Sequence, residues 1–303
     1  MRRRYLILIL LTGLVCSVAL VLRKGRPEAR QDEWPVNMAH RGASSLAPEN
    51  TIEAFRIALE AGAGGLELDV HMTRDGHIVV IHDATVDRTT SSTGAISEMT
   101  IDELRGPDAG YNFSPDAGLT RPYRGRGSKV PTFEEVLREF PGVAVNIDIK
   151  AGSSGIEAAV LEVIREAKAL GRVLVVSTSH ATVQRFRRIS GGHVSTGASR
   201  WETGIFYLLS RLHLEWLARP DYDALQVPPV HRGIPLVTPR FIAAAHSRGV
   251  RVDAWTINQA DEMRRLLDLG VDVIMTDRPG TLAEVLTYYA ARSSAMEARP
   301  KSV

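Results

Sequence analysis

Residues 65–83 read GLELDVHMTRDGHIVVIHD, and this stretch decides how the chain folds. Gly65–Val70 is a predicted strand, and the strand-like Val79–Ile81 follows after only a short polar segment. A parallel crossover needs a dozen residues or more, so the second segment must return antiparallel as a hairpin. Asp75-Gly76 supplies its turn. His82 therefore returns close to the level of the acidic residues on the first strand.

Outside this hairpin, short strand patterns alternate with amphipathic helical patterns, which is typical of a parallel α/β sheet. The predicted strands are Val36–Ala39, Gly65–Val70, Val143–Ile149, Val173–Thr178, Val194–Ala198, Ala224–Val227, Val252–Ile257 and Val273–Thr276. The helical patterns are Thr51–Ala61, Ile156–Leu170, Ala181–Ile189, Thr238–Arg248, Ala260–Leu269 and Thr281–Ala291. An eightfold repeat over about 250 residues predicts a TIM (β/α)8 barrel. A doubly wound open sheet has the same local signals.

The predicted barrel domain covers residues 35–291 and contains one long insertion. Residues 84–130 are rich in Ser, Gly, Pro and Arg and carry a single short helical pattern, Thr100–Leu104. We expect this insertion to leave the barrel after the hairpin and to cover one rim of the site. Residues 292–303 are predicted to form a polar tail.

The N-terminus carries a membrane signal. Arg2, Arg3 and Arg4 precede an uncharged apolar run, Tyr5–Leu22, which further basic residues close. Its length of about 18 residues is just enough to cross a bilayer as a helix. We predict an uncleaved signal anchor at 1–24 and a linker at 25–34, with the catalytic domain outside the cytoplasm. Basic residues flank both ends, so the positive-inside rule favours this orientation only weakly.

Composition excludes several classes of protein and site. The 37 Lys and Arg residues nearly balance 35 Asp and Glu, giving a net charge of +2. This balance provides no basic field of the kind that gathers nucleic acid, so we expect no such partner. The single cysteine, Cys16, lies in the apolar N-terminal run, which excludes an intrachain disulfide and a cysteine-based metal site.

Two predicted strands place acidic side chains together. Glu67 and Asp69 are two residues apart on a strand and therefore point to the same side. Asp148 and Lys150 repeat this spacing on the next predicted parallel strand. A divalent cation would offset the cost of clustering these carboxylates, and their hard oxygen ligands suit Mg²⁺ or Ca²⁺ better than Zn²⁺. The alternative is a buried ion pair between Lys150 and one of the acids.

Two histidines and two basic residues lie at the same rim. His40 and His82 each end a strand pattern, and imidazoles with a pKa of about 6.5 can serve as acid and base in one displacement. A lone histidine at a strand end is more often structural, but a pair beside clustered carboxylates favours catalysis. Arg41 and Lys150 carry charge suited to a phosphoryl group. The residues alone predict metal-assisted phosphoryl or acyl hydrolysis.

Several motifs together resemble the glycerophosphodiester phosphodiesterases. They are Ala39-His40-Arg41-Gly42, Pro48-Glu49-Asn50-Thr51, Glu67-Leu68-Asp69-Val70, Thr73-Arg74-Asp75-Gly76, His82-Asp83, Asn146-Ile147-Asp148-Ile149-Lys150, Trp255-Thr256-Ile257-Asn258 and Thr276-Asp277-Arg278-Pro279. The resemblance spans roughly Val36 to Leu286. It implies a TIM barrel that hydrolyses a glycerophosphodiester to glycerol 3-phosphate and an alcohol with one divalent metal ion, Mg²⁺ or Ca²⁺.

The same resemblance implies a role for each site residue. His40 and His82 would be the general acid and base, and the metal would be held by Glu67, Asp69 and Asp148. Substrate would be contacted by Arg41, Glu49, Lys150 and Trp255. The family usually has Glu where this chain has Asp148, so metal preference or affinity could differ.

Two other functions are weighed against this one. An apolar stretch after the fifth strand, Gly204–Leu209 with Leu212, Leu214, Trp216 and Leu217, could reach the lipid headgroup region and admit a lysophospholipid, giving lysophospholipase D activity. The same stretch could equally be a barrel helix. A non-catalytic barrel that binds a phosphorylated ligand is the second alternative. The sequence leaves the departing alcohol, the native cation and the oligomeric state open.

Overall fold

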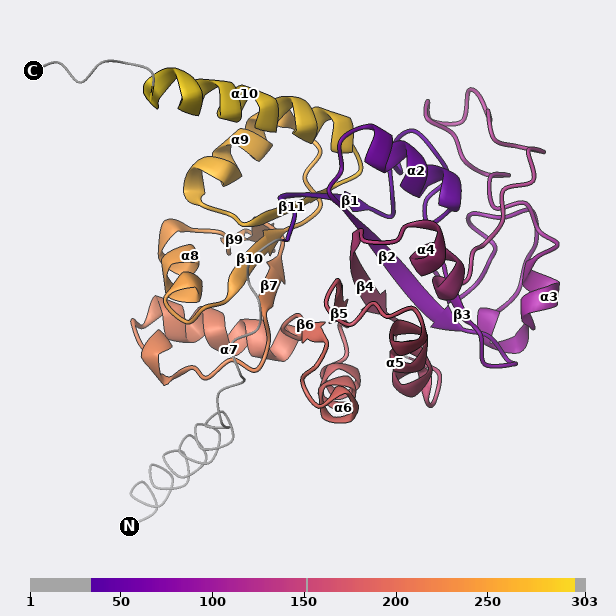
Figure 1. Ribbon diagram of the computed structural model, residues 1–303, viewed down its shortest axis with the longest axis horizontal. Coiled ribbons are helices and arrows are strands. Elements are labelled where there is room, and N and C mark those ends of the chain that lie inside the picture. Colours follow the sequence, from indigo (N-terminus) through magenta and orange to yellow (C-terminus); the bar gives the residue numbers. More distant parts are fainter. Residues whose placement is uncertain (1–33, 151, 298–303) are drawn as a thin grey trace, which may run out of the picture.

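Eight parallel strands form the centre of the computed structural model, which describes residues 34–150 and 152–297 (Figure 1). In order around the ring they are β1 (Asn37–His40), β2 (Gly65–Met72), β4 (Ala144–Ile149), β5 (Val173–Val176), β6 (Ser195–Thr196), β7 (Ala224–Val227), β10 (Arg251–Ala254) and β11 (Val273–Thr276). β11 pairs with β1. Between β6 and β7, the Asp223 N–H donates to the Thr196 carbonyl at 2.7 Å and the Ala198 N–H donates to the Ala224 carbonyl at 2.8 Å. These contacts close the ring, so the predicted TIM barrel is confirmed and the open sheet is excluded.

One helix follows each strand or its loop and covers the outside of the ring. The helices are α2 (Ile52–Glu60), α4 (Phe133–Glu139), α5 (Ile156–Glu166), α6 (His180–Ser190), α7 (Arg200–Arg211), α8 (Pro239–His246), α9 (Ala260–Leu269) and α10 (Pro279–Glu297). Local sequence fixes where they begin. Thr132 and Ser199 each accept from the third N–H of their helix, while Glu135 and Glu202 bond back in a capping box.

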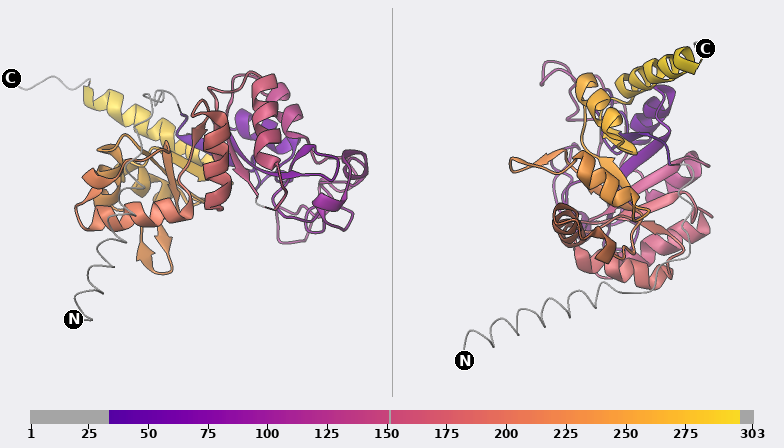
Figure 2. Two further views of the ribbon diagram at one scale, coloured as in Figure 1. Left: turned by 90° about the horizontal axis from the view of Figure 1, so that it is seen from below. Right: turned by 90° about the vertical axis from the view of Figure 1, so that its left-hand side faces the viewer.

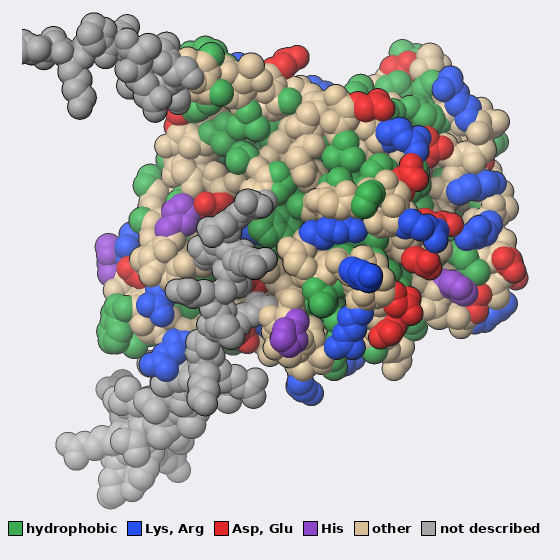
Figure 3. Space-filling model, viewed as in Figure 1, with side chains coloured by type: hydrophobic (Ala, Val, Ile, Leu, Met, Phe, Trp, Pro, Cys, Tyr) green, Lys and Arg blue, Asp and Glu red, His purple; other side chains and the backbone are tan. Residues whose placement is uncertain are grey.

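The predicted hairpin is present. β3 (Ile78–Val80) pairs antiparallel with the end of β2, and the Ile81 N–H donates to the Asp69 carbonyl at 3.0 Å. The following excursion contains η1 (Ile96–Glu98) and α3 (Ile101–Leu104) around a small hydrophobic cluster of its own. Basic and acidic side chains are interspersed on the right of Figure 3, the side on which the excursion lies in Figure 1. This mixture is typical of a solvated surface.

Gly204–Leu209 of the apolar stretch after the fifth parallel strand lies in α7, a helix of the barrel, while Leu212, Leu214, Trp216 and Leu217 follow this helix. Phe206 is buried against the core, whereas Leu208, Leu212 and Trp216 are exposed. A separate hairpin, β8 (Val230–His231) with β9 (Ile234–Pro235), follows β7 and projects from the body (Figure 2). η2 (Glu215–Leu217) connects α7 toward β7.

The predictions for the two ends of the chain can be compared with the structure only where it describes residues. α10 continues to Glu297, so the predicted polar tail at 292–303 begins too early; residues 298–303 lie outside the described part. The predicted signal anchor at 1–24 and all of the linker except Trp34 also lie outside it. Within residues 34–150 and 152–297, no helix has the length and apolarity needed to span a bilayer.

Candidate active site

The predicted site residues gather at the carboxyl ends of neighbouring strands. His40 ends β1 and is in register with Glu67 of β2, while Asp69 is in register with Asp148 of β4. Lys150 follows β4 directly. The carboxyl ends of barrel strands are where active sites of this fold are built. Sequence spacing therefore predicted this grouping correctly.

The loop after β1 turns sharply to hold its side chains over the barrel. Arg41 and Asn50 both adopt positive φ, at 55° and 58°, and the Asn50 N–H donates to the Arg41 carbonyl at 3.0 Å. Gly42 also has positive φ, and a Cβ there would lie 2.7 Å from the backbone of Ala54. Only glycine fits this approach. The Asn50 amide then donates to the Asp69 carboxylate at 3.0 Å, tying the loop to β2.

Each candidate catalytic histidine has a carboxylate on its Nδ1. The Nδ1 of His40 lies 2.7 Å from Asp277, and the Nδ1 of His82 lies 2.6 Å from Asp83. Burial by itself lowers the pKa of His40, but Glu67 and Asp277 outweigh it, and the pKa lies above its usual value. These contacts orient the two rings so that Nε2 of each remains for a reacting group.

Asp277 is itself held from several sides. Its carboxylate accepts from the hydroxyl of Ser44 at 2.8 Å and from the amide of Asn258 at 2.6 Å. Burial raises the pKa of a carboxyl, but the hydrogen bonds from His40 and Asn258 reverse that effect and lower the pKa of Asp277 to about 2. Asp277 is therefore a permanent anion behind His40 at neutral pH.

The acid cluster is partly neutralised by Lys150. Its Nζ lies 2.7 Å from Asp69 and 2.6 Å from Asp148. The predicted alternative of a buried Lys150 ion pair is thus present, and it involves two acids. Glu67 lacks such a cation: its carboxylate accepts the Arg41 N–H at 3.0 Å and is only 5% exposed. Burial and the neighbouring Asp69 raise the pKa of Glu67 to about 7.

These acids fit a hard cation in chemistry, although they do not converge on one point. No group of three His, Cys, Asp or Glu side chains among the described residues is arranged as a finished metal site. However, Oδ1 of Asp148 is buried without a hydrogen-bond partner in the described chain. An unpaired carboxylate oxygen beside a second buried carboxylate, Glu67, is a donor set suited to Mg²⁺ or Ca²⁺.

Arg88 from the excursion joins the two sides of the site. Its guanidinium donates to both oxygens of Glu49 at 2.8 Å, and its Nε donates to Asp83 at 2.6 Å. Glu49 in turn accepts from Arg41 at 3.0 Å. Burial would raise the pKa of Glu49, but these guanidinium groups lower it. Glu49 is therefore held as an anion that positions two arginines.

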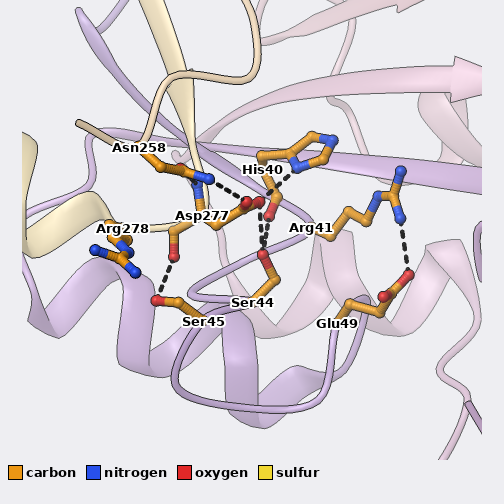
Figure 4. Close-up of a pocket in the computed structure, with 8 residues that line it drawn as sticks. All are labelled: His40, Arg41, Ser44, Ser45, Glu49, Asn258, Asp277 and Arg278. Atoms are coloured by element: carbon orange, nitrogen blue, oxygen red, sulfur yellow. Dashed lines mark hydrogen bonds and ion pairs between the residues drawn. The ribbon is translucent and has the colours of Figure 1, made fainter. Parts of the chain in front are cut away.

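A cavity of about 330 Å³ opens beside His40. It is lined by His40, Arg41, Ser44, Ser45, Glu49, Asn258, Asp277 and Arg278 (Figure 4). Trp255, expected in the wall of the substrate pocket, follows β10 and is 42% exposed, and it is not part of this lining. The cavity therefore lies on the β1, β10 and β11 side of His40, away from β4.

The chain's similarity to known proteins agrees with this geometry. A family model described as the glycerophosphoryl diester phosphodiesterase family matches residues 40–281. The chain belongs to this family. The family members act as phosphoric diester hydrolases, and so does this chain.

Individual relatives cover nearly the whole barrel. A glycerophosphodiester phosphodiesterase of Caldanaerobacter subterraneus subsp. tengcongensis is 34% identical over 82% of this chain and 96% of its own length. A rat protein named lysophospholipase D GDPD1 is 27% identical over 84% of this chain and 87% of its own. The solved glycerophosphoryl diester phosphodiesterase domain of an uncharacterized Mycobacterium tuberculosis protein has a TM-score of 0.73 at 22% identity. It matches 84% of this chain and all of that domain.

Three residues of the site have no role predicted from the sequence: Asp277, Asp83 and Arg88. Asp277 and Asp83 lie inside motifs that were recognised, so their positions were visible in the sequence. Their contacts were not, because they depend on how side chains turn. Arg88 lies in the insertion, where no pattern separated it from the other arginines.

Proposed function

We propose that the chain hydrolyses glycerophosphodiesters to glycerol 3-phosphate and an alcohol, in a metal-dependent reaction with His40 and His82 as the acid–base pair. The observation that carries this proposal is the matched pair of histidine–carboxylate contacts at the carboxyl ends of the strands. Asp277 holds the Nδ1 of His40, and the Nε2 of the same ring lies 4.0 Å from Glu67, at the edge of the acid cluster. Two histidines held in this way suit a displacement in which one proton is removed and another is delivered.

The raised pKa of His40 suits the role of general acid, because it favours the protonated ring. His82, oriented by Asp83, is then the base. It accepts a proton from the attacking water while the oxygen of that water forms a bond to phosphorus. The bond between phosphorus and the departing alcohol breaks, and His40 gives its proton to that alcohol. Proton exchange with solvent returns both rings to their starting states.

The remaining residues of the site bind charge. Glu67, Asp69 and Asp148 would hold one divalent cation, Mg²⁺ or Ca²⁺, which supplies positive charge beside the phosphoryl oxygens. Arg41 and Lys150 would contact the phosphate, and Glu49 keeps Arg41 in place. A phosphoryl transition state needs mainly positioning and charge stabilisation, which these groups offer. Trp255 stays a prediction as a substrate contact.

The test is release of glycerol 3-phosphate from glycerophosphocholine by the full chain, with EDTA, Mg²⁺ or Ca²⁺. We expect turnover that EDTA abolishes and that either His40→Ala or His82→Ala reduces by at least about 100-fold. His246→Gln is the matched control, because His246 also pairs with a carboxylate, Asp272, at 2.8 Å but lies outside the site. Near wild-type activity in either alanine variant would defeat the acid–base assignment.

Lysophospholipase D activity is the second candidate. It is favoured by exposed apolar side chains on the β8–β9 hairpin, where Val230 is 55% and Ile234 is 52% exposed, and by the name of the rat relative. The predicted membrane anchor at 1–24 would hold the chain at a lipid surface. Running the same assay with lysophosphatidylcholine separates the two substrates. The names of the relatives, which are phosphodiesterases, argue against the alternative of a non-catalytic barrel that binds a phosphorylated ligand.

A further inference from the structure

The cavity beside His40 lies on the side of this residue away from the acid cluster. The phosphoryl group has to reach His40 and the acid cluster, which belong to β1, β2 and β4. The cavity extends from His40 in the other direction, toward Asn258 after β10 and Asp277 after β11. A phosphodiester carries an alcohol on each side of phosphorus. When the phosphorus lies between His40 and the acids, one of these two alcohols falls in the cavity.

The charged groups of the cavity wall are almost all committed to one another. Glu49 is paired with Arg41 and with Arg88. Asp277 is occupied by His40, Ser44 and Asn258. The wall therefore presents little free negative charge to a ligand.

Arg278 is the exception. It follows β11, and its side chain is exposed. Its guanidinium has no hydrogen-bond or ion-pair partner within residues 34–150 and 152–297. In Figure 4, Arg278 and the Arg41–Glu49 pair lie on opposite sides of Ser44 and Ser45. The cavity thus offers one uncommitted positive charge, on the wall opposite the Glu49 pair.

We propose that this cavity is the subsite for the departing alcohol and that Arg278 makes it favour an alcohol bearing a carboxylate, such as serine. The inference rests on the proposed function and narrows its substrate class. A guanidinium binds a carboxylate through parallel N–H···O contacts, and it repels the cationic end of choline. The hydroxyls of Ser44 and Ser45 line the same wall, although both are engaged with Asp277.

Two substrates differ only in the group that Arg278 would recognise. Glycerophosphoserine is glycerophosphoethanolamine with one added carboxylate, so the ratio of their kcat/KM values isolates that contact. We expect the full wild-type chain to favour the serine diester by about fivefold, the range of an accessible ion pair. Arg278→Gln should bring the ratio to about one, Arg278→Glu should reverse it, and Arg278→Lys should retain part of the preference.

Arg188→Gln is the control, because Arg188 is an exposed arginine of α6 that lies outside the cavity lining. It should leave the ratio unchanged. An equal ratio in wild type and Arg278→Gln would overturn the subsite, and so would an equal loss for both diesters, which would place Arg278 on the shared glycerol phosphate half. If wild type hydrolyses no diester at all, the proposed function itself fails. Matching thermal unfolding curves verify that each variant is folded.

Discussion

Oδ1 of Asp277 lies 2.7 Å from Nδ1 of His40, although 237 residues separate them. The contact exists because β11, the last strand, pairs with β1, the first. Residues at the carboxyl ends of these two strands become neighbours only when the barrel closes. Closure of the ring and orientation of the proposed general acid are therefore one structural event.

Removing the charge of Asp277 should impair catalysis more than binding. We expect Asp277→Asn to lower kcat by about 100-fold with little change in KM, because His40 then loses the anion that holds its proton and its orientation. Steady-state kinetics on glycerophosphocholine measure both parameters. Asp272→Asn removes the carboxylate of the exposed His246 pair and should leave kcat intact. A change in KM alone for Asp277→Asn would contradict a positioning role.

Asp277 should also stabilise the fold in a pH-dependent way. Its folded pKa of about 2 lies below the unfolded value of 3.8, so its contribution is complete above pH 3.8 and is lost as the pH falls toward 2. We expect wild type to exceed Asp277→Asn in free energy of unfolding by about 2 kcal/mol at pH 6. Urea unfolding at pH 6, 4 and 3 should show this gap narrowing. A gap independent of pH would assign it to packing instead.

Arg88 should act through the two carboxylates it joins. Arg88→Gln frees Glu49 and Asp83, and we expect kcat/KM to fall about tenfold as the Arg41 and His82 side chains lose their fixed positions. The double variant with Glu49→Gln should lose less than the sum of both losses, since the residues share one contact. Arg105→Gln breaks a similar arginine–glutamate pair between the excursion and α4, with Glu135 at 2.9 Å, and should have no effect on kcat/KM.

Lys150 should compete with a divalent cation for the same oxygens. Its Nζ contacts both Asp69 and Asp148. We expect Lys150→Met to raise the affinity for Ca²⁺ roughly tenfold, because affinity rises with the net negative charge of the ligand set. The same variant should lose turnover, since the proposed phosphate contact of Lys150 is removed. Calorimetric titration measures the affinity, with Lys129→Met as the control. Unchanged affinity would place the cation away from these two acids.

The barrel could be predicted from the sequence because its two signals, the short hairpin and the alternation of strands and helices, are local patterns. The hairpin followed from the short Asp75-Gly76 segment, and the eightfold repeat followed from alternating strand and helix patterns. It was harder to predict which side of α7 is buried. Phe206 and Leu208 are similar in hydrophobicity, and only the packing of the folded chain buries one and exposes the other. The sequence also did not predict that α10 extends to Glu297, because the last residues of this helix show no periodic apolar pattern.

The site was predictable as a set of residues but not as a network. Two-residue spacing on β2 and β4 was enough to group Glu67, Asp69 and Asp148. That Lys150 would lie between two of these acids depends on side-chain rotamers, which spacing does not determine. The same holds for Arg88, whose partners Asp83 and Glu49 lie 5 and 39 residues away along the chain.

The excursion after β3 leaves and rejoins the barrel at nearly the same place. The Val80 N–H donates to the carbonyl of Pro131 at 2.8 Å, and Val79 forms a bridge with Thr132. Because its ends meet and most of its hydrophobic cluster lies within it, the length of the segment after Arg88 is not constrained by the register of the barrel strands. The length and sequence of the excursion can therefore vary while the barrel stays the same. Arg88 is the residue through which the excursion contacts the site, at Glu49 and Asp83.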